Sequence, residues 1–440
     1  MERPIQRVVD LTDPSSNRLL GVTLEQARVR IAHGNPGEVR AIAGSYAIVA
    51  ADGETVRMAR SLDRPLRYFL AKQTDGPMLV AADRIDAIRA FLESAGLSGQ
   101  FHPSYTRMVP AHHVTTLRLI GCPDPAATYE RFLELAPATL PVDVSEIGRR
   151  YVGALADEIE EWLETIPARE PVGVSFSGGV DSGAVFLVTY HVLRRLGHSP
   201  SRLKAFTLSA GEGSDLAQAR RFLAELSLEF FLEAIETAPE RLDPYEAVRV
   251  VEDYKPLDVE AAAAGLALAR GIREPYPDWR FLLDGDGGDE NLKDYPLEEN
   301  GEVTIRSVIA NPLLYQEGWG VGKLKHSLTY TGGTSRSCTR TYAPLRRYGL
   351  EGFSPFLRPR LVELAAAIPF AELTGHDVER LYRLKGEIVA NGVETITGIR
   401  MPVYPKRRFQ DGVGPVDATS PPRRAHREAD YRSHFHSLYA

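Results

Sequence analysis

The chain has 440 residues, of which 43% are hydrophobic and 25% charged, as in a globular protein with room for two or three domains. A net charge of −7 disfavours nucleic acid as a partner, and no apolar run approaches the roughly 20 residues of a membrane span. The two cysteines, Cys122 and Cys338, argue against a disulfide scaffold or a cysteine zinc site, and the first ten residues lack the apolar segment of a signal peptide. We therefore expect a cytoplasmic protein without a nucleic-acid or membrane partner.

Residues 1–120 show the pattern of an α+β domain rich in hairpins. Short β-like runs cover 40–50, 53–60, 65–71 and 77–82, separated by Asp-Gly and Pro-containing turn signals. Amphipathic helices are predicted over 23–34 and 83–96, each ending near a glycine. Residues 121–143 contain four prolines and are predicted to be a linker.

Residues 144–440 are predicted to form a second domain with alternating helices and strands. After a helix over 144–166, strands at 172–176, 203–209, 229–235 and 281–284 alternate with helices at 183–197, 214–227 and 260–271. This order predicts a parallel sheet with helices on both faces and a ligand site at the carboxyl ends of its strands. Residues 303–400 are mostly helical in pattern.

The turn after the first of these strands has the composition of an anion-binding loop. It reads Ser-Gly-Gly-Val-Asp-Ser over 177–182 and leads directly into a helix, so that backbone N–H groups and the helix N-terminus point at one place. An aspartate would repel a phosphate, so Asp181 is better suited to bind Mg²⁺ beside it. A strand–turn–helix junction without a ligand is the alternative. The predicted phosphate-binding residues are Ser177, Gly178, Gly179, Asp181 and Ser182.

A second glycine-rich turn, 284–291, follows the strand at 281–284 and carries Asp284, Asp286, Asp289 and Glu290. Carboxylates this close together repel one another unless a cation shares the site. Asp289 is therefore predicted to complete a Mg²⁺ site with Asp181. A solvated acidic loop is the alternative.

These motifs resemble those of a known family. The 177–182 loop is similar to the pyrophosphate loop of the N-type ATP pyrophosphatases, and 284–290 and 406–414 resemble segments of asparagine synthetases within that class. The resemblance implies an adenine-nucleotide α-hydrolase-like domain that uses ATP to convert a carboxylate to an acyl-adenylate. It also implies that backbone near Leu208 reads the adenine, that Asp286 accepts a proton from the incoming amine, and that Lys406 stabilises charge at the α-phosphate.

The first domain resembles the Ntn-type glutamine amidotransferase domain of the same synthetases. The matching segments are 44–47, 60–68, 80–82 and 108–114. That family uses an N-terminal cysteine as its glutaminase nucleophile. Here residues 1–3 are Met-Glu-Arg and the first cysteine is Cys122. Glutamine hydrolysis is therefore not expected, and the domain is predicted to be a structural relic or an interaction surface.

Two further departures bear on the substrate. The cyclising β-lactam and carbapenam synthetases carry a tyrosine at the position of Asp286 and a glutamate on a later helix, at a position that aligns near Thr339. Neither residue of that pair is present here. Phe353 stands where the asparagine synthetases have an arginine, which removes one carboxylate clamp and makes an unchanged aspartate substrate doubtful.

We therefore predict an ATP- and Mg²⁺-dependent amide-forming ligase that joins a small-molecule or peptide carboxylate to an amine or ammonia, in natural-product biosynthesis. One alternative is an intramolecular cyclase of the β-lactam synthetase or lasso-peptide cyclase kind. Another, of a different class, is a catalytically inactive nucleotide-binding regulatory protein. The oligomeric state stays open, with a homodimer as the candidate.

Overall fold

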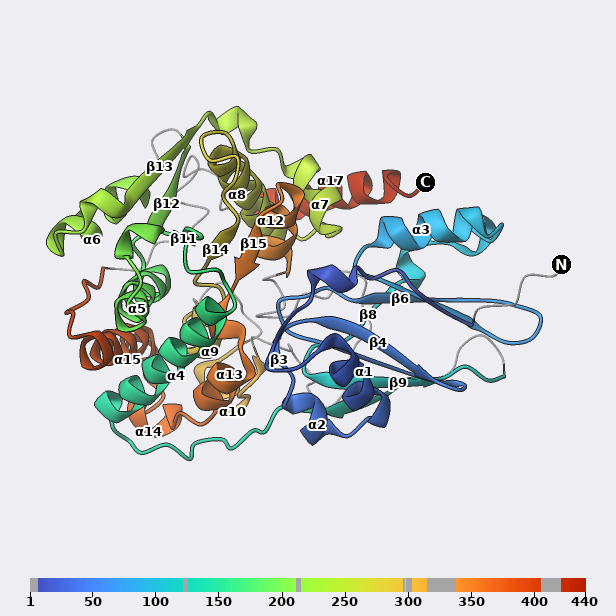
Figure 1. Cartoon of the computed structure of the whole chain (residues 1–440), viewed down its shortest axis with the longest axis horizontal. Coiled ribbons are helices and arrows are strands. Elements are labelled where there is room, and N and C mark those ends of the chain that lie inside the picture. Colours follow the sequence, from blue (N-terminus) through green and yellow to red (C-terminus); the bar gives the residue numbers. More distant parts are fainter. Residues whose placement is uncertain are drawn as a thin grey trace. The chain divides into compact units, whose positions relative to one another are not determined.

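The computed structural model describes residues 7–121, 126–210, 215–295, 297, 303–314, 338–404 and 421–440, with the side chains of the last two ranges described from 340 and 427 onward. The chain divides into two compact units. The described part of the first comprises residues 7–134 and 433–440, and that of the second lies within 135–432 (Figure 1). Among the helices of the described ranges, none has the length and apolar character needed to cross a membrane.

The first unit is built on two four-stranded sheets, with strand orders β1-β7-β6-β8 and β10-β9-β5-β4, and a short β2-β3 pair. The strands and helices predicted for the first 120 residues are confirmed, and β10 lies inside the segment predicted as a linker. Thr23 and Gln26 form a capping box at the start of α1, and Gly34 ends that helix with a φ of 75°. The elements are β1 (Val8–Asp10), β2 (Arg18–Leu20), α1 (Leu24–His33), α2 (Pro36–Arg40), β3 (Ala43–Ser45), β4 (Ala47–Asp52), β5 (Thr55–Arg60), β6 (Arg67–Ala71), β7 (Met78–Ala82), α3 (Ile85–Ser94), β8 (Arg107–Met108), β9 (His113–Arg118) and β10 (Thr128–Arg131).

The second unit is built on the predicted parallel sheet, which has five strands in the order β13-β12-β11-β14-β15. The order places β11 and β14, the two strands that precede the glycine-rich turns, directly beside each other. The strands are β11 (Val172–Ser175), β12 (Leu203–Ala210), β13 (Leu232–Thr237), β14 (Phe281–Leu283) and β15 (Glu351–Phe353). Its helices include α4 (Val144–Glu164), α5 (Val180–Arg195), α6 (Asp215–Glu225), α7 (Pro244–Val251), α8 (Pro256–Arg273), α9 (Gly288–Asn291), α10 (Ile305–Ala310), α12 (Ala343–Arg347), α13 (Pro359–Ala366), α14 (Phe370–Thr374) and α15 (Val378–Thr397). Helix α17 (Pro421–Ser437) begins in this unit, and its residues from Ser433 onward belong to the first.

Strand β15 was not predicted, because residues 303–400 are mostly helical in pattern. Three residues at a sheet edge give too short a pattern to recognise, and the strand exists through its pairing with β14. Phe353 at its end is buried, and its ring stacks on Trp162 with centroids 4.8 Å apart. Phe353 therefore contributes to the core.

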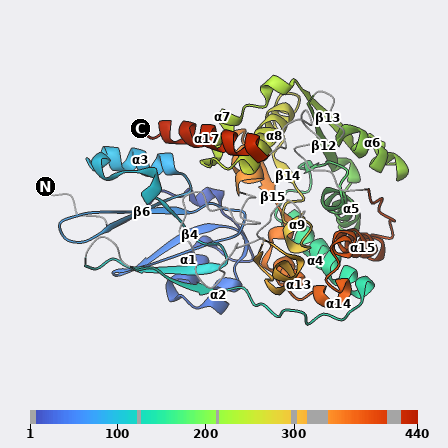
Figure 2. The ribbon, with the colours of Figure 1, turned by 180° about the vertical axis from the view of Figure 1, so that it is seen from behind.

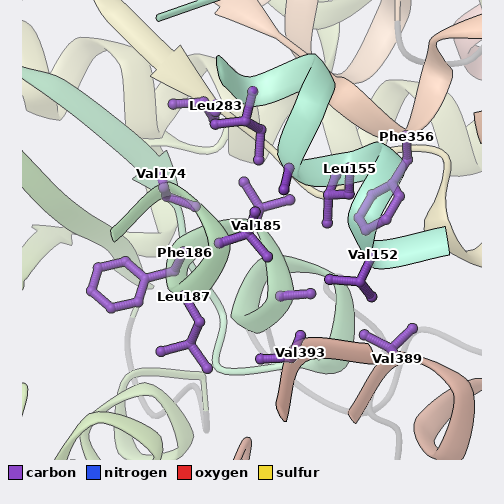
Figure 3. Packing of buried hydrophobic residues seen from close by; sticks show 14 of the residues in the cluster. Val152, Leu155, Val174, Val185, Phe186, Leu187, Leu283, Phe356, Val389 and Val393 are labelled. Carbon is purple, nitrogen blue, oxygen red and sulfur yellow. The ribbon is translucent and has the colours of Figure 1, made fainter. Parts of the chain in front are cut away.

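Helices cover both faces of the parallel sheet, as predicted (Figures 1 and 2). On one face, α4, α5, α6, α13 and α15 share a large apolar core with β11 and β14. On the other face, α8 and α12 pack against β12, β13 and β14. Figure 3 shows how Val152 and Leu155 of α4, Val185 of α5 and Val389 of α15 meet in the first of these cores.

Helices α4 and α15 approach closely because each has a glycine at the contact. A Cβ on Gly148 would lie 2.5 Å from the carbonyl oxygen of Ile388, and a Cβ on Gly392 would overlap the carbonyl oxygen of Gly148. These glycines allow backbone-to-backbone packing that any larger residue would prevent. The contact fixes the position of α15, and with it the position of Lys385.

Candidate functional site

The loop that joins β11 to α5 is held in shape by its own serines. The hydroxyl of Ser182 accepts a hydrogen bond from the backbone N–H of Ser177 at 3.2 Å, and the two hydroxyls lie 3.2 Å apart. Gly178 has a φ of 70°, and a Cβ there would lie 3.0 Å from the backbone of Ala219. The loop therefore needs glycine at Gly178, and it presents backbone N–H groups at the N-terminus of a 16-residue helix.

The two glycine-rich turns meet at the carboxyl ends of β11 and β14. A Cβ on Gly285 would lie 2.9 Å from both the Cβ of Asp181 and the backbone nitrogen of Ser182, and a Cβ on Gly288 would overlap the Asp181 carboxylate. Glycines at these places let the acidic turn lie directly against the start of α5. The two predicted motifs therefore form one site, as expected for adjacent parallel strands.

Lys385 of α15 links the two motifs by ion pairs. Its Nζ lies 2.5 Å from Asp181 Oδ2 and 3.4 Å from Asp294 Oδ2, and it also contacts Asp289 Oδ1. The lysine side chain is 4% exposed. Both predicted metal ligands, Asp181 and Asp289, thus converge on one buried ammonium group.

The electrostatics of this cluster favour cationic ligands. Burial by itself would lower the pKa of Lys385, but Asp181, Asp289 and Asp294 raise it well above its usual value, so the lysine is charged. Three carboxylates therefore face one ammonium group.

A magnesium ion fits this donor set with help from a nucleotide. Within the described ranges, no group of three or more histidine, cysteine, aspartate or glutamate side chains is arranged to hold a metal ion alone. Mg²⁺ is commonly bound by one or two carboxylates together with phosphate oxygens and water. Asp181 and Asp289 meet that requirement, because both contact Lys385 Nζ and Asp181 lies in the first turn of α5.

Asp284 and Asp286 lie in the same turn but differ in their surroundings. Asp284 is buried; it accepts hydrogen bonds from the backbone N–H of Asp286 at 2.9 Å and from the Ser354 hydroxyl at 2.9 Å, so it stabilises the turn. Asp286 is 22% exposed, and its Oδ2 accepts a 2.6 Å hydrogen bond from the hydroxyl of Thr341. Burial raises the pKa of Asp286 above its ordinary value, against the opposing effects of Arg340 and Thr341.

Glu290 completes the acidic turn on its buried side. Its Oε1 accepts a hydrogen bond from the hydroxyl of Tyr295 at 2.5 Å and lies 3.7 Å from Nη2 of Arg340. Nη1 of the same arginine is 4.0 Å from Asp286 Oδ1. One guanidinium group therefore lies beside both carboxylates.

The remaining sequence predictions fall outside this cluster. Leu208 is buried in the core beside Phe206 and Ile235, where its side chain packs, and the predicted reading of adenine by its backbone stays a prediction. Lys406 and Cys122 lie outside the described residues. Their roles also stay predictions.

Sequence reasoning missed Lys385 and Asp294. A signal for Lys385 was present: it falls on the buried stripe of α15 formed by Leu381, Leu384, Ile388 and Val389. A lysine on an apolar helix stripe is rarely buried without acidic partners, so its position indicates an internal ion pair. No comparable pattern pointed to Asp294.

Comparisons with known proteins agree with the motifs. Residues 159–331 match the family model for asparagine synthase. Over 262 residues the chain is 27% identical to a protein of Dictyostelium discoideum described as a probable glutamine-hydrolyzing asparagine synthetase. That match covers 56% of this chain and 43% of the relative, so the chain spans less than half of the relative's length.

Two solved structures show weaker likeness. The NMN synthetase of Francisella tularensis is 13% identical with a TM-score of 0.24, and the match covers 57% of this chain and 96% of that one. The NAD⁺ synthetase of Burkholderia pseudomallei is 16% identical with a TM-score of 0.23, covering 56% and 90%. The architecture rests on the strand order described above. The segment that matches the asparagine synthase family model, 159–331, contains both glycine-rich turns and the strands β11 and β14 that precede them.

Proposed function

We propose that the chain is an ATP-dependent ligase that activates a substrate carboxylate as an acyl-adenylate, with release of pyrophosphate, and transfers the acyl group to an amine or ammonia. The observation that supports this most is the ion-pair network in which Lys385 contacts both Asp181 and Asp289. It joins the phosphate-binding loop and the acidic turn in one buried site. A nucleotide and a carboxylate are the reactants that such a site suits.

In the first step, the loop residues bind the phosphates. The backbone N–H groups of Gly178 and Gly179 and the hydroxyls of Ser177 and Ser182 lie at the N-terminus of α5 and would donate hydrogen bonds to phosphate oxygens. Lys385 adds a buried positive charge beside them. When bound by Asp181 and Asp289, Mg²⁺ would neutralise phosphate charge and orient the polyphosphate.

In the second step, Asp286 would accept a proton from the amine. As the amine nitrogen forms its bond to the acyl carbon, the bond from that carbon to the adenylate oxygen breaks and AMP leaves. The nitrogen must lose one proton, and the Asp286 carboxylate, 22% exposed, can be reached by it. The resemblance to asparagine synthetases implies that Lys406 stabilises the charge at the α-phosphate.

We further propose that ammonia or an amine reaches the site without glutamine hydrolysis. The first cysteine of the sequence is Cys122, so residues 1–121 carry no thiol nucleophile of the kind the family's glutaminases use. Cyclisation of the β-lactam type is disfavoured, because Asp286 contacts Thr341 and lies beside Arg340, not a tyrosine–glutamate pair. Under this proposal, the reaction joins two separate molecules.

The test is release of pyrophosphate and AMP from MgATP with a panel of carboxylates, each alone and with ammonia, methylamine or glutamine. Wild type is compared with Asp181→Asn, which removes the carboxylate shared by loop and lysine. The matched control is Lys204→Met, which removes a different Lys–Glu ion pair near the start of β12. We expect carboxylate-dependent release in wild type and the control, and a loss of roughly 1,000-fold in Asp181→Asn.

The amine dependence separates the alternatives. Completion of turnover only with ammonia or methylamine supports the proposal. A dehydrated product formed from a carboxylate alone would show a cyclase. Turnover with glutamine as good as with ammonia would contradict glutamine independence, and ATP binding without pyrophosphate release from any carboxylate would favour a regulatory protein.

A further inference from the structure

We propose that Arg340 and Thr341 are positioning residues that keep the Asp286 carboxylate ionised and oriented to take the proton of the attacking amine. This inference rests on the proposed function, because it assigns roles within the amine-transfer step. Neither residue belongs to a motif that the sequence singled out. They lie one and two residues after Thr339, the position that aligns with the glutamate of the cyclising synthetases.

Contacts from one short element orient the carboxylate. The π-helical turn Cys338–Tyr342 carries both side chains. The Thr341 hydroxyl donates to Asp286 Oδ2 at 2.6 Å, and Arg340 Nη1 lies 4.0 Å from Asp286 Oδ1. Each carboxylate oxygen thus has its own polar partner on the turn, which fixes the plane of the carboxylate.

Packing and side-chain contacts hold the turn in place. A Cβ on Gly265 of α8 would lie 2.6 Å from the carbonyl oxygen of Arg340, so this glycine is what allows α8 and the turn to touch. Arg340 Nη2 also donates to the hydroxyl of Tyr295 at 3.4 Å and lies 3.7 Å from Glu290. π-Helical turns are rare and occur often at functional sites.

The groups around Asp286 shift its pKa in opposite directions. Burial raises its pKa, and Glu290 and Asp289 of α9 raise it further, while Arg340 and Thr341 lower it. Arg340 itself stays charged: burial would lower its pKa, but Tyr295, Glu290, Asp286 and Asp258 of α8 raise it well above its usual value. Among the facing groups, Arg340 is the cation that favours an ionised Asp286.

The first experiment measures the ionisation of Asp286 directly. The full-length protein is labelled with [4-¹³C]aspartate in magnesium-free buffer, and the carboxyl resonance absent from Asp286→Asn is followed with pH. We expect the titration midpoint of Asp286 to rise by at least about one pH unit in Arg340→Gln and by less in Thr341→Val, and Arg340→Lys to restore most of the shift. An unchanged midpoint in Arg340→Gln would overturn the proposal.

The second experiment separates the amine step from activation. Carboxylate-dependent ATP–pyrophosphate exchange should stay within about threefold of wild type in Arg340→Gln, because Asp286 takes no part in activation. The methylamine-dependent step should fall about 10- to 100-fold, with its acidic limb displaced to higher pH. Equal losses in both steps would indicate a structural role and contradict the proposal.

A matched control is Arg347→Gln, which alters a half-exposed arginine just beyond the turn, 4.0 Å from Glu246. We expect this variant to leave the titration midpoint of Asp286, the ATP–pyrophosphate exchange and the methylamine-dependent step unchanged. Absence of exchange in wild type with every carboxylate would refute the proposed function, whereas the Asp286 titration would still report whether Arg340 controls its ionisation. The two failures are therefore distinguishable.

Discussion

Two buried arginines of the first unit bind backbone carbonyls, whereas the buried lysine of the candidate site binds carboxylates. Backbone partners are not confined to the first unit, because buried Lys293 of the second unit donates to the carbonyl oxygens of Asn311 and Pro312. In the first unit, Arg60 is 2% exposed and donates to the carbonyl oxygens of Val109 at 2.6 Å and Arg64 at 2.8 Å. Arg67 donates to the carbonyl oxygen of Asp83 at 2.5 Å. These arginines bind backbone.

In the second unit, Lys385 is bound by side-chain carboxylates. Its partners are Asp181, which follows β11, and Asp289 and Asp294, which follow the neighbouring strand β14. A backbone carbonyl has no charge to exchange, whereas a carboxylate can take up a proton or a metal ion. A buried cation bound by backbone carbonyls therefore has a structural role, whereas one bound by carboxylates can take part in a reaction. The kind of partner distinguishes the two better than the degree of burial.

The largest effect is expected from Lys385→Met. Removing the ammonium leaves three neighbouring carboxylates without their shared cation, so we expect a stability loss of about 3–5 kcal/mol in the second unit and a loss of pyrophosphate release of at least roughly 1,000-fold. Denaturant unfolding and the pyrophosphate assay measure the two effects. Lys204→Met, which loses a half-exposed ion pair, should change stability by less than about 1 kcal/mol. Pyrophosphate release close to that of wild type in Lys385→Met would show that the lysine is not needed for the reaction.

The two units should respond to pH with opposite sign. Burial lowers the pKa of His113 to about 4 and that of His112 well below its ordinary value, so the folded first unit holds both neutral. The unfolded chain binds protons below about pH 6.5, and the stability of this unit is lost as pH falls from 6.5 toward 4, by about 3 kcal/mol for His113. Burial, with Asp258, raises the pKa of Asp253 in the second unit to about 7, so its contribution is lost as pH rises from about 4 to 7.

Hydrogen exchange followed by peptide and corrected for intrinsic rates measures this difference at pH 7 and pH 5. Peptides covering β9 should lose protection at the lower pH, and His113→Gln should reduce that loss. The control His33→Gln changes a histidine that is 59% exposed and should leave the pH dependence as it is. Equal protection of β9 at the two pH values would contradict the prediction.

Arg60→Met should destabilise the first unit without altering the chemistry of the second. The substitution leaves the carbonyls of Val109 and Arg64 buried without this donor, which costs about 3 kcal/mol. Unfolding should be easier by that amount, while pyrophosphate release per folded molecule stays within about twofold. Arg118→Met, at an exposed position on β9, is the control. A large loss of pyrophosphate release in folded Arg60→Met would show that the first unit takes part in activation.

The smallest effect is expected from Gly288→Ala. The new Cβ would overlap the Asp181 carboxylate, so the two turns must move apart by a fraction of an ångström, and we expect activity to fall about tenfold. Gly153→Ala on α4 is the matched control, because its Cβ would meet Ile396 at an ordinary 3.7 Å. Its thermal midpoint should rise slightly, since alanine favours a helix over glycine. Equal activity in the two variants would show that the reaction does not require the two glycine-rich turns to lie this close together.

The sequence by itself determined much of the second unit. The alternation of strands and helices predicted the parallel sheet, and the composition of the two turns predicted an anion-binding loop and an acidic turn at its carboxyl edge. These features are local, because a glycine-rich turn after an apolar strand can be recognised from a few consecutive residues. The phosphate-binding and catalytic roles given to those residues remain predictions.

Only the tertiary structure decided which side chains share the site. Lys385 reaches Asp181 and Asp289 because Gly148 and Gly392 let α15 pack against α4, and Arg340 reaches Asp286 because Gly265 lets α8 touch the π-helical turn. These partners lie far apart in the chain, and nothing in their local pattern encodes the pairing. Interactions between distant residues depend on how helices pack, which is decided by many contacts acting together.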